Sequence, residues 1–264
     1  MRLPGDIDLA LALAVWRRNV TVYRRTWKMN ILPNFFEPIL YLVGMGIGLG
    51  AYLGQDVGGM PYLAYIAPGL LASACMNGAV FETTYNMFIK MNFARLYDAF
   101  LGTPAQVQDI AAGELLWAVT RSCIYGFAFL VVAGVLTVGF ELPLITSPGV
   151  LFAPLIIVLT GALFAAIGEL FTSFVKNIDI YSYFYTLFYT PLFLFSGIFY
   201  PVNQFPYGEQ VAWFMPLYHP VRVLRALLHG GFETTHALSI VWMIVVTGVL
   251  FAIVPGRMRR QLFR

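Results

Sequence analysis

The chain offers few side chains for catalysis or for binding a cofactor. Its three lysines, Lys28, Lys90 and Lys176, do not follow the glycine-rich run that cradles nucleotide phosphates. The three histidines are not at the spacing of zinc ligands, and no Gly-x-Ser-x-Gly elbow is present. Both cysteines lie in apolar runs, where they behave as small apolar side chains. We therefore expect no catalytic residue, no metal site and no cofactor in this chain.

Four ionisable residues lie within or close to long apolar stretches: Glu82, Glu114, Arg121 and Glu169. Charged groups at membrane depth are costly, so they usually face protein or water. All four lie near one boundary of their stretches, and the simplest interpretation is that they reach the aqueous phase there. A proton relay is the alternative, but none of the four lies near the centre of a stretch.

Residues 180–199 are rich in aromatic side chains, and several of them share one face of a helix. Such a face can stack on sugar rings or on apolar substrates, and it can equally pack against lipid. The sequence alone does not choose between a substrate pathway and ordinary packing. The residues of this face are Tyr181, Tyr185, Phe188, Phe195 and Phe199.

The composition indicates which solvent these residues meet. Of 264 residues, 59% are hydrophobic and 11% are charged, whereas about 25% of a soluble globular domain is charged. The bilayer must therefore surround most of the chain. The net charge of +3 comes with no basic domain, which argues against a nucleic-acid partner. The sequence predicts an all-α membrane protein.

A spanning helix needs about 20 mostly apolar residues, because the hydrocarbon core is about 30 Å thick. Charge-free stretches of this length predict six spans, which place both termini on one side. The basic residues near the termini, including the tail at 257–264, contrast with the loops at 54–62 and 139–148, which have no Lys or Arg. By the positive-inside rule, both termini are cytoplasmic. The predicted spans lie near 33–53, 63–87, 114–138, 149–173, 180–199 and 237–255.

Residues 1–30 are predicted to form an amphipathic interface helix. Six apolar residues recur at four- and three-residue steps, and basic residues occupy the other side. A helix of this kind lies on the cytoplasmic leaflet, or packs on a soluble partner. The apolar stripe is Leu9, Leu13, Trp16, Val20, Tyr23 and Trp27, and the basic face is Arg17, Arg18, Arg24, Arg25 and Lys28.

Residues 200–232 precede the last predicted span, and their apolar run, Trp213–Leu228, is too short and too charged to cross the bilayer. Arg222 and Arg225 lie three apart on one helical face. A re-entrant helical hairpin on the outer side fits this pattern best. The two arginines could bind an anionic head group there or reach lipid phosphate.

In the first span, the alternate glycines Gly44, Gly46, Gly48 and Gly50 predict close helix packing, either within the subunit or in a homodimer.

Three segments resemble the permeases of type-two ABC exporters. The first is SGIFYP at 196–201, followed by QFP at 204–206, PLYHPV at 216–221 and Arg225. The second is Thr103-Pro104 with Asp109-Ile110 and Gly113-Glu114, and the third is FETTY at 81–85. The resemblance extends over nearly the whole chain and is closest to the permeases that export nodulation factors, which are lipo-oligosaccharides.

The resemblance implies a homodimer of this permease in the bacterial inner membrane, paired with two copies of a separate ATPase subunit that binds ATP and Mg. It also implies a cytoplasmic coupling segment at 95–109, supported by the interface helix, with a lesser contact near Lys176 and Asp179. The alternative is a solvated loop in which Thr103-Pro104 marks only a helix break. The implied contacts are Arg95, Tyr97, Asp98, Phe100, Thr103, Pro104 and Asp109, with Trp16, Arg17, Arg18, Arg24 and Arg25 on the interface helix.

These observations predict a transport subunit and not an enzyme. The expected substrate is an amphipathic glycolipid, a lipo-oligosaccharide or a polysaccharide that leaves the cytoplasm. Efflux of hydrophobic drugs is the alternative within the same family. An ion channel or a membrane-embedded enzyme is a remote third, because the sequence has neither a charged filter nor a polar catalytic cluster.

Overall fold

The computed structural model describes residues 6–49, 57, 59–204 and 206–263, with the side chains at 29–35, 37–38, 46–47 and 49 left undescribed. This part of the chain is helical, with several π-helical turns. The helices α1 to α11 and the π- and 3₁₀-helical segments η1 to η6 are, in chain order, α1 (Leu9–Tyr41), η1 (Leu42–Leu49), α3 (Tyr62–Phe81), η2 (Glu82–Asn86), η3 (Ile89–Phe93), α4 (Leu96–Leu101), α5 (Val107–Phe140), η4 (Pro148–Phe152), α6 (Ala153–Thr172), α7 (Ile180–Phe184), η5 (Tyr185–Tyr189), α8 (Thr190–Phe195), η6 (Val202–Gln204), α9 (Gly208–Trp213), α10 (Tyr218–His229) and α11 (Thr234–Leu262).

Four helical stretches of the described chain are long and apolar enough to cross a bilayer: Tyr62–Phe93, Val107–Phe140, Pro148–Thr172 and Thr234–Leu262. They match the second, third, fourth and sixth predicted spans. The predicted span at 180–199 corresponds to the shorter succession of α7, η5 and α8. The predicted first span follows α1 and η1 to Leu49, and its last residues lie outside the described part. The count of six therefore stays a prediction.

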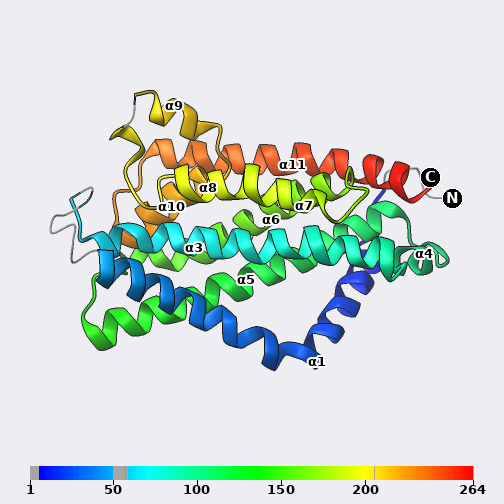
Figure 1. Ribbon diagram of the computed structural model, residues 1–264, viewed down its shortest axis with the longest axis horizontal. Helices are drawn as coiled ribbons and strands as arrows, with labels where there is room; N and C mark the ends of the chain where they lie inside the picture. The colour runs from blue at the N-terminus through cyan, green and yellow to red at the C-terminus, as the bar shows by residue number, and fades with distance from the viewer. Residues whose placement is uncertain (1–5, 50–56, 58, 205, 264) are drawn as a thin grey trace.

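The long helices run side by side, and the two ends of the bundle differ (Figure 1). The start of α1, the end of α11 and the short helix α4 lie at one end. The connection between α5 and α6 lies at the other end, together with α9 and α10. This arrangement agrees with the expected placement of both termini on one side, while the assignment of that side to the cytoplasm still rests on the positive-inside rule.

Helix α3 forms the centre of the bundle and packs against α5, α6 and α10. Nearly all of its residues are buried. By contrast, α5 and α11 turn exposed apolar side chains outward, such as Val135 and Val138 on α5 and Val241 and Val245 on α11. Exposed apolar faces of this extent fit helices that contact lipid or another subunit, because neither requires a polar surface.

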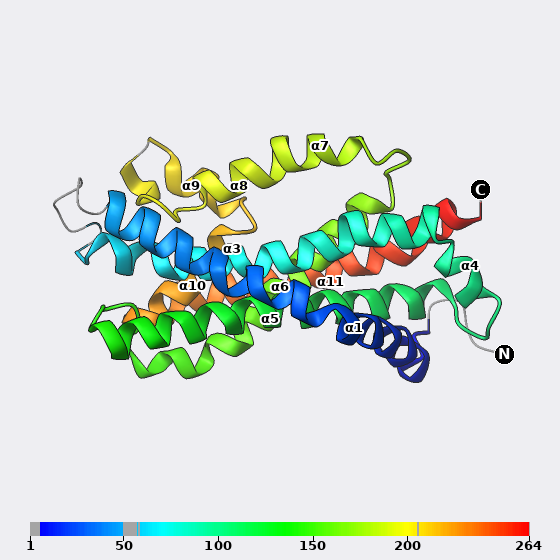
Figure 2. The ribbon, with the colours of Figure 1, turned by 60° about the horizontal axis from the view of Figure 1, so that its bottom comes forward.

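Helix α1 is continuous from Leu9 to Tyr41 and passes through the boundary predicted near residue 30, with a bend visible in Figure 2. It packs against α5 through Ala12, Val15 and Asn19, all of which are buried. Gly113 on α5 permits this approach, since a Cβ at that position would lie 2.6 Å from the carbonyl oxygen of Ala12. Half of the predicted apolar stripe is exposed, namely Leu9, Leu13 and Trp27, and the other half, Trp16, Val20 and Tyr23, is half-buried. The most deeply buried residues of α1 are the smaller ones at Ala12, Val15 and Asn19, which the stripe does not include.

The segment predicted as a helical hairpin, 200–232, contains η6, α9 and α10. Helix α10 packs against α3, α11 and η4, so the segment is joined firmly to the end of the bundle opposite the termini. The backbone N–H groups of Thr146 and Ser147 donate to the carbonyl of Leu228, at 2.9 and 3.0 Å, which ties α10 to the loop before η4. Its depth in the membrane stays a prediction.

Candidate functional site

The predicted coupling segment forms the short helix α4 and the turn that leads into α5, at the end of the bundle that carries the termini (Figure 1). Arg95 begins it in the left-handed conformation, with φ of 46°, which reverses the chain after η3. Arg95, Asp98, Thr103 and Pro104 are exposed, and Phe100 is half-buried. These five residues form the surface that the segment offers to a partner.

Tyr97 faces the opposite way and is fully buried. Its ring stacks on Phe100 at a centroid distance of 6.5 Å and joins a cluster with Met87 and Ile110. Burial raises the pKa of Tyr97 well above its ordinary value, and the nearby carboxylates of Glu114 and Glu169 raise it further. Tyr97 therefore anchors α4 to the spans, and it does not present its side chain to a partner.

Asp109 is also buried, and its role in the fold is to cap α5. Its Oδ2 accepts from the backbone N–H of Gln106 at 2.9 Å, and its Oδ1 accepts from the backbone N–H of Asp8 at 2.7 Å. A carboxylate in the first turn of a helix also complements the helix dipole. One side chain thus joins the start of α1 to the start of α5, directly behind the exposed surface of α4.

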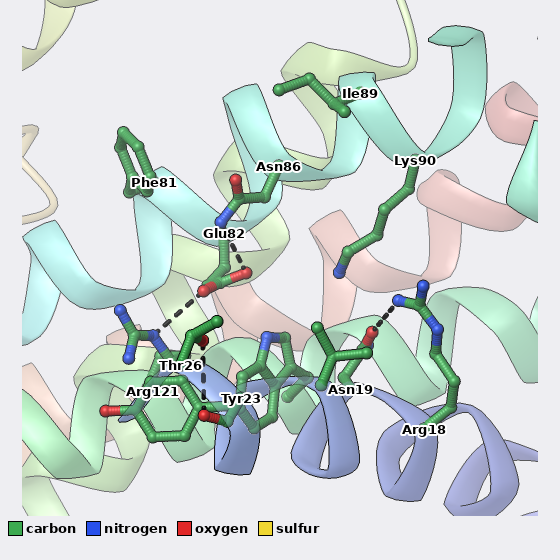
Figure 3. A pocket seen from close by; sticks show the side chains of 12 residues that line it. Arg18, Asn19, Tyr23, Thr26, Phe81, Glu82, Asn86, Ile89, Lys90 and Arg121 are labelled. Atoms are coloured by element: carbon green, nitrogen blue, oxygen red, sulfur yellow. Dashed lines mark hydrogen bonds and ion pairs between the residues drawn. The ribbon is translucent and has the colours of Figure 1, made fainter. Parts of the chain in front are cut away.

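A buried charged cluster connects α1, α3 with its π-helical extension, and α5 (Figure 3). Arg121 Nε lies 3.0 Å from Glu82 Oε1, and both side chains are more than nine-tenths buried. Lys90 Nζ lies 2.7 Å from Glu114 Oε2, which also accepts from Asn19 Nδ2 at 3.1 Å. Glu82, Glu114 and Arg121 therefore do not reach water, contrary to the simplest interpretation of the sequence. They are buried and paired.

The interface-helix residues divide between two roles. Trp16 is half-buried, and its Nε1 donates to Thr120 Oγ1 on α5 at 2.9 Å. Arg18 donates to Asn19 Oδ1 at 3.1 Å, beside the charged cluster. Arg17, Arg24 and Arg25 are exposed and free to meet lipid head groups or a partner subunit.

The five aromatic residues predicted as a substrate pathway do not share one open surface. Tyr181 is buried, and its hydroxyl lies 2.8 Å from Thr172 Oγ1. Tyr185 is half-buried, with its hydroxyl 3.1 Å from Thr84 Oγ1 and its ring stacked on Tyr85. Phe188 and Phe199 are also half-buried, whereas Phe195 is exposed. The first two residues join α7 and η5 to the core.

The two arginines of α10 are both half-buried and bond within the bundle. Arg225 Nη2 donates to the carbonyl of Gly197 at 2.8 Å and to that of Tyr65 at 3.2 Å, with its guanidinium 3.9 Å from the centre of the Tyr65 ring. Arg222 donates to Thr235 Oγ1 at 2.6 Å. Both hold α10 in place, and Arg225 does so by bonding to the SGIFYP segment at 196–201.

The comparisons with known proteins agree with the geometry. A family model described as "ABC-2 type transporter" matches residues 10–229, from the start of α1 to the end of α10. The chain belongs to the ABC-2 type transporter family. It is 34% identical to nodulation protein J of Rhizobium leguminosarum bv. viciae, over 96% of this chain and 95% of that protein. It is 29% identical to the inner membrane transport permease YadH of Escherichia coli, over 73% and 72% of the two chains.

As an ABC-2 type transporter, the chain is a multi-pass membrane protein of a family of transport subunits. Within its described residues, no group of three or more His, Cys, Asp and Glu side chains could hold a metal ion. The predicted site of this ABC-2 type transporter consists of an exposed edge on α4 and the buried side chains of Tyr97 and Asp109.

Sequence reasoning on this ABC-2 type transporter noted Glu82, Glu114 and Arg121 but missed their partners Lys90 and Asn19. The spacing of the charged residues could have indicated these pairs. Glu82 and Lys90 lie eight residues apart, and Glu114 and Arg121 lie seven apart, so each pair shares one face of its own helix. Two neighbouring antiparallel helices with opposite charges in this order can form both ion pairs at once.

Proposed function

We propose that this chain is the transmembrane subunit of an ABC exporter in the bacterial inner membrane. Two copies pair with two copies of a separate ATPase, which binds ATP and Mg. The cargo is an amphipathic glycolipid, lipo-oligosaccharide or polysaccharide that leaves the cytoplasm. The family match supports the transporter class, and the similarity to nodulation protein J supports the choice of cargo.

One observation carries the proposal: α4 is exposed on one side and anchored in the spans on the other. Arg95, Asp98, Thr103 and Pro104 face outward, while Tyr97 is buried behind them. A segment that passes motion from one subunit to another needs both properties. An exposed edge binds the moving ATPase, and a buried anchor transfers the displacement, since packed interiors deform little.

Reversal of one exposed charge tests the coupling. Asp98→Arg is expected to lower ATP hydrolysis by the co-purified complex about tenfold or more, with an unchanged unfolding midpoint, because Asp98 is exposed and contributes little to folding. Glu209→Arg is the matched control, since Glu209 is an exposed acidic residue in α9 at the opposite end of the bundle. Equal hydrolysis by both variants and the wild type would exclude α4 as the coupling element.

The cargo is tested with proteoliposomes that contain the permease and its ATPase. ATP-dependent movement of a labelled lipo-oligosaccharide is expected, and no movement is expected with a non-hydrolysable analogue. A deletion strain that keeps normal export of surface glycolipids but becomes sensitive to amphiphilic drugs would replace this cargo with hydrophobic drugs. Ion conductance by the purified chain without any ATPase would contradict the exporter proposal altogether.

A further inference from the structure

A pocket lies between α1, the extension of α3 into η3, and α5, next to the charged cluster (Figure 3). Its volume is about 310 Å³. Binding pockets for small organic ligands span roughly 300–1,000 Å³, so this one has room for a polar head group but not for a whole oligosaccharide. Three cationic side chains, Arg18, Lys90 and Arg121, line it against one lining carboxylate, that of Glu82.

The position of the pocket along the helices corresponds to the depth of lipid head groups. Glu82 lies 20 residues after Tyr62, the first residue of α3, which is about 30 Å at 1.5 Å per residue. Arg121 lies 19 residues before Phe140, the last residue of α5, which gives nearly the same length. The hydrocarbon core is about 30 Å thick. With Tyr62 and Phe140 at the outer edge of the hydrocarbon, as the predicted topology places them, the Glu82–Arg121 pair lies at its inner edge, and Lys90 and Arg18 lie at head-group depth.

The cations of the pocket keep unused hydrogen-bond donors. Arg121 is 5% exposed, and its Nη1 has no hydrogen-bond partner among the described residues. The Lys90 ammonium has three N–H groups, of which its bond to Glu114 takes one. The half-buried Arg18 donates one hydrogen bond within the described part of the chain, from Nη1 to Asn19 Oδ1. A buried donor without a partner is costly, and an anionic oxygen removes that cost.

Apolar side chains surround the mouth of the pocket. Val22 of α1, Phe81 of α3 and Ile89 of η3 all line it, and each is between 43% and 46% exposed. A site for a soluble anion has no need of such a rim. A ligand with an anionic head and acyl chains satisfies both parts, because its chains cover the exposed apolar surface.

From these contacts we propose that the pocket binds the phosphate head group of an anionic phospholipid from the cytoplasmic leaflet. Arg18 supplies the charge that no carboxylate of the described residues balances, while Lys90 and Arg121 keep their ion pairs with Glu114 and Glu82 and donate their remaining N–H groups to the phosphate oxygens. The acyl chains lie along Val22, Phe81 and Ile89. The bound lipid fills the gap between α1 and α3 and fixes the interface helix against the bundle. This inference does not require an ATPase partner or a particular cargo.

Native mass spectrometry of the purified full chain, with added lipids of identical acyl chains, tests the proposal. One molecule of phosphatidylglycerol is expected to bind at least tenfold more tightly than phosphatidylcholine. Arg18→Gln is expected to weaken phosphatidylglycerol binding about tenfold, the equivalent of one charge-assisted hydrogen bond. Arg24→Gln, on the same helix but outside the pocket, is the matched control and is expected to bind as the wild type does. Within the part of the chain that the structure describes, neither arginine is a partner in a buried ion pair, so both variants should fold.

Three outcomes would overturn the proposal. Equal binding of both lipids would show that the pocket does not distinguish an anionic head group from a zwitterionic one. Equal losses in Arg18→Gln and Arg24→Gln would place the lipid on the general basic surface of α1. Displacement of the lipid by millimolar inorganic phosphate, with equal affinity for a six-carbon-chain phosphatidylglycerol, would identify a free-anion site in place of a lipid site.

Discussion

The Glu82–Arg121 ion pair is expected to make Arg121→Met strongly destabilising. The two side chains are 8% and 6% exposed, and without Arg121 the only partner of the Glu82 carboxylate among the described residues is the amide of Asn86, at 3.0 Å. Removing one partner of a buried pair costs about 3–5 kcal/mol. The cation–π contact with the Tyr23 ring, at 4.6 Å, adds roughly 1 kcal/mol.

Thermal unfolding in detergent measures this loss. For a chain of this size, each kcal/mol shifts the midpoint by roughly 2–4 °C, so Arg121→Met should lower it by about 8–24 °C. Arg24→Met, which alters an exposed arginine of α1, should change stability by less than about 0.5 kcal/mol.

A double variant separates the ion pair from simple loss of packing. Glu82→Gln combined with Arg121→Met leaves no isolated charge and retains a partner for Asn86. We expect it to recover more than half of the loss, since replacing both members of a buried pair is often nearly neutral. If the two single losses add to within about 0.5 kcal/mol of the double, the pair carries no mutual energy and the reasoning is refuted.

Three further changes follow from single contacts. Gly113→Ala should destabilise the docking of α1 on α5 by roughly 1–3 kcal/mol, measured as faster proteolysis within α1, whereas Gly134→Ala, in open space on the same helix, should not. Arg225→Lys should lower the unfolding midpoint, because a lysine is shorter and lacks the planar guanidinium that lies over the Tyr65 ring while donating to the carbonyls of Gly197 and Tyr65; an unchanged midpoint would remove Arg225 as a link. Burial holds the pKa of His219 down to about 4, so stability should fall as pH drops from about 6.5, the unfolded value, towards 4, and the slope should be shallower in His219→Gln.

Hydropathy predicted the four long apolar helices and the helical character of 200–232, because length and apolar content alone decide them. It did not predict the buried face of α1. In a bilayer, lipid is as apolar as leucine, so a stripe of large apolar residues does not show which face meets protein. Ala12 and Val15 are buried because they are small enough to fit against Gly113.

The sequence predicted the segment that forms the candidate site, but it did not predict which of its residues are exposed and which are buried. Resemblance placed Arg95, Tyr97, Asp98 and Asp109 together, and only the fold shows that Tyr97 and Asp109 turn inward. Burial of a tyrosine or an aspartate depends on partners that are distant in sequence, such as the backbone of Asp8. The charge pairs depend in addition on which helices become neighbours, a choice that neither spacing nor composition makes.

The order of charges on α3 and α5 restricts how these helices can move. Glu82 lies level with Arg121, and Lys90 lies level with Glu114. If α3 slid along α5 in one direction, its glutamate would approach the other glutamate; in the opposite direction, its lysine would approach the arginine. Both displacements break two attractions and create a repulsion in a region of low dielectric constant. We therefore expect the two helices to tilt or rotate as one body. Under the coupling role proposed for α4, a displacement of that helix would then reach the opposite end of the bundle without sliding of α3 along α5.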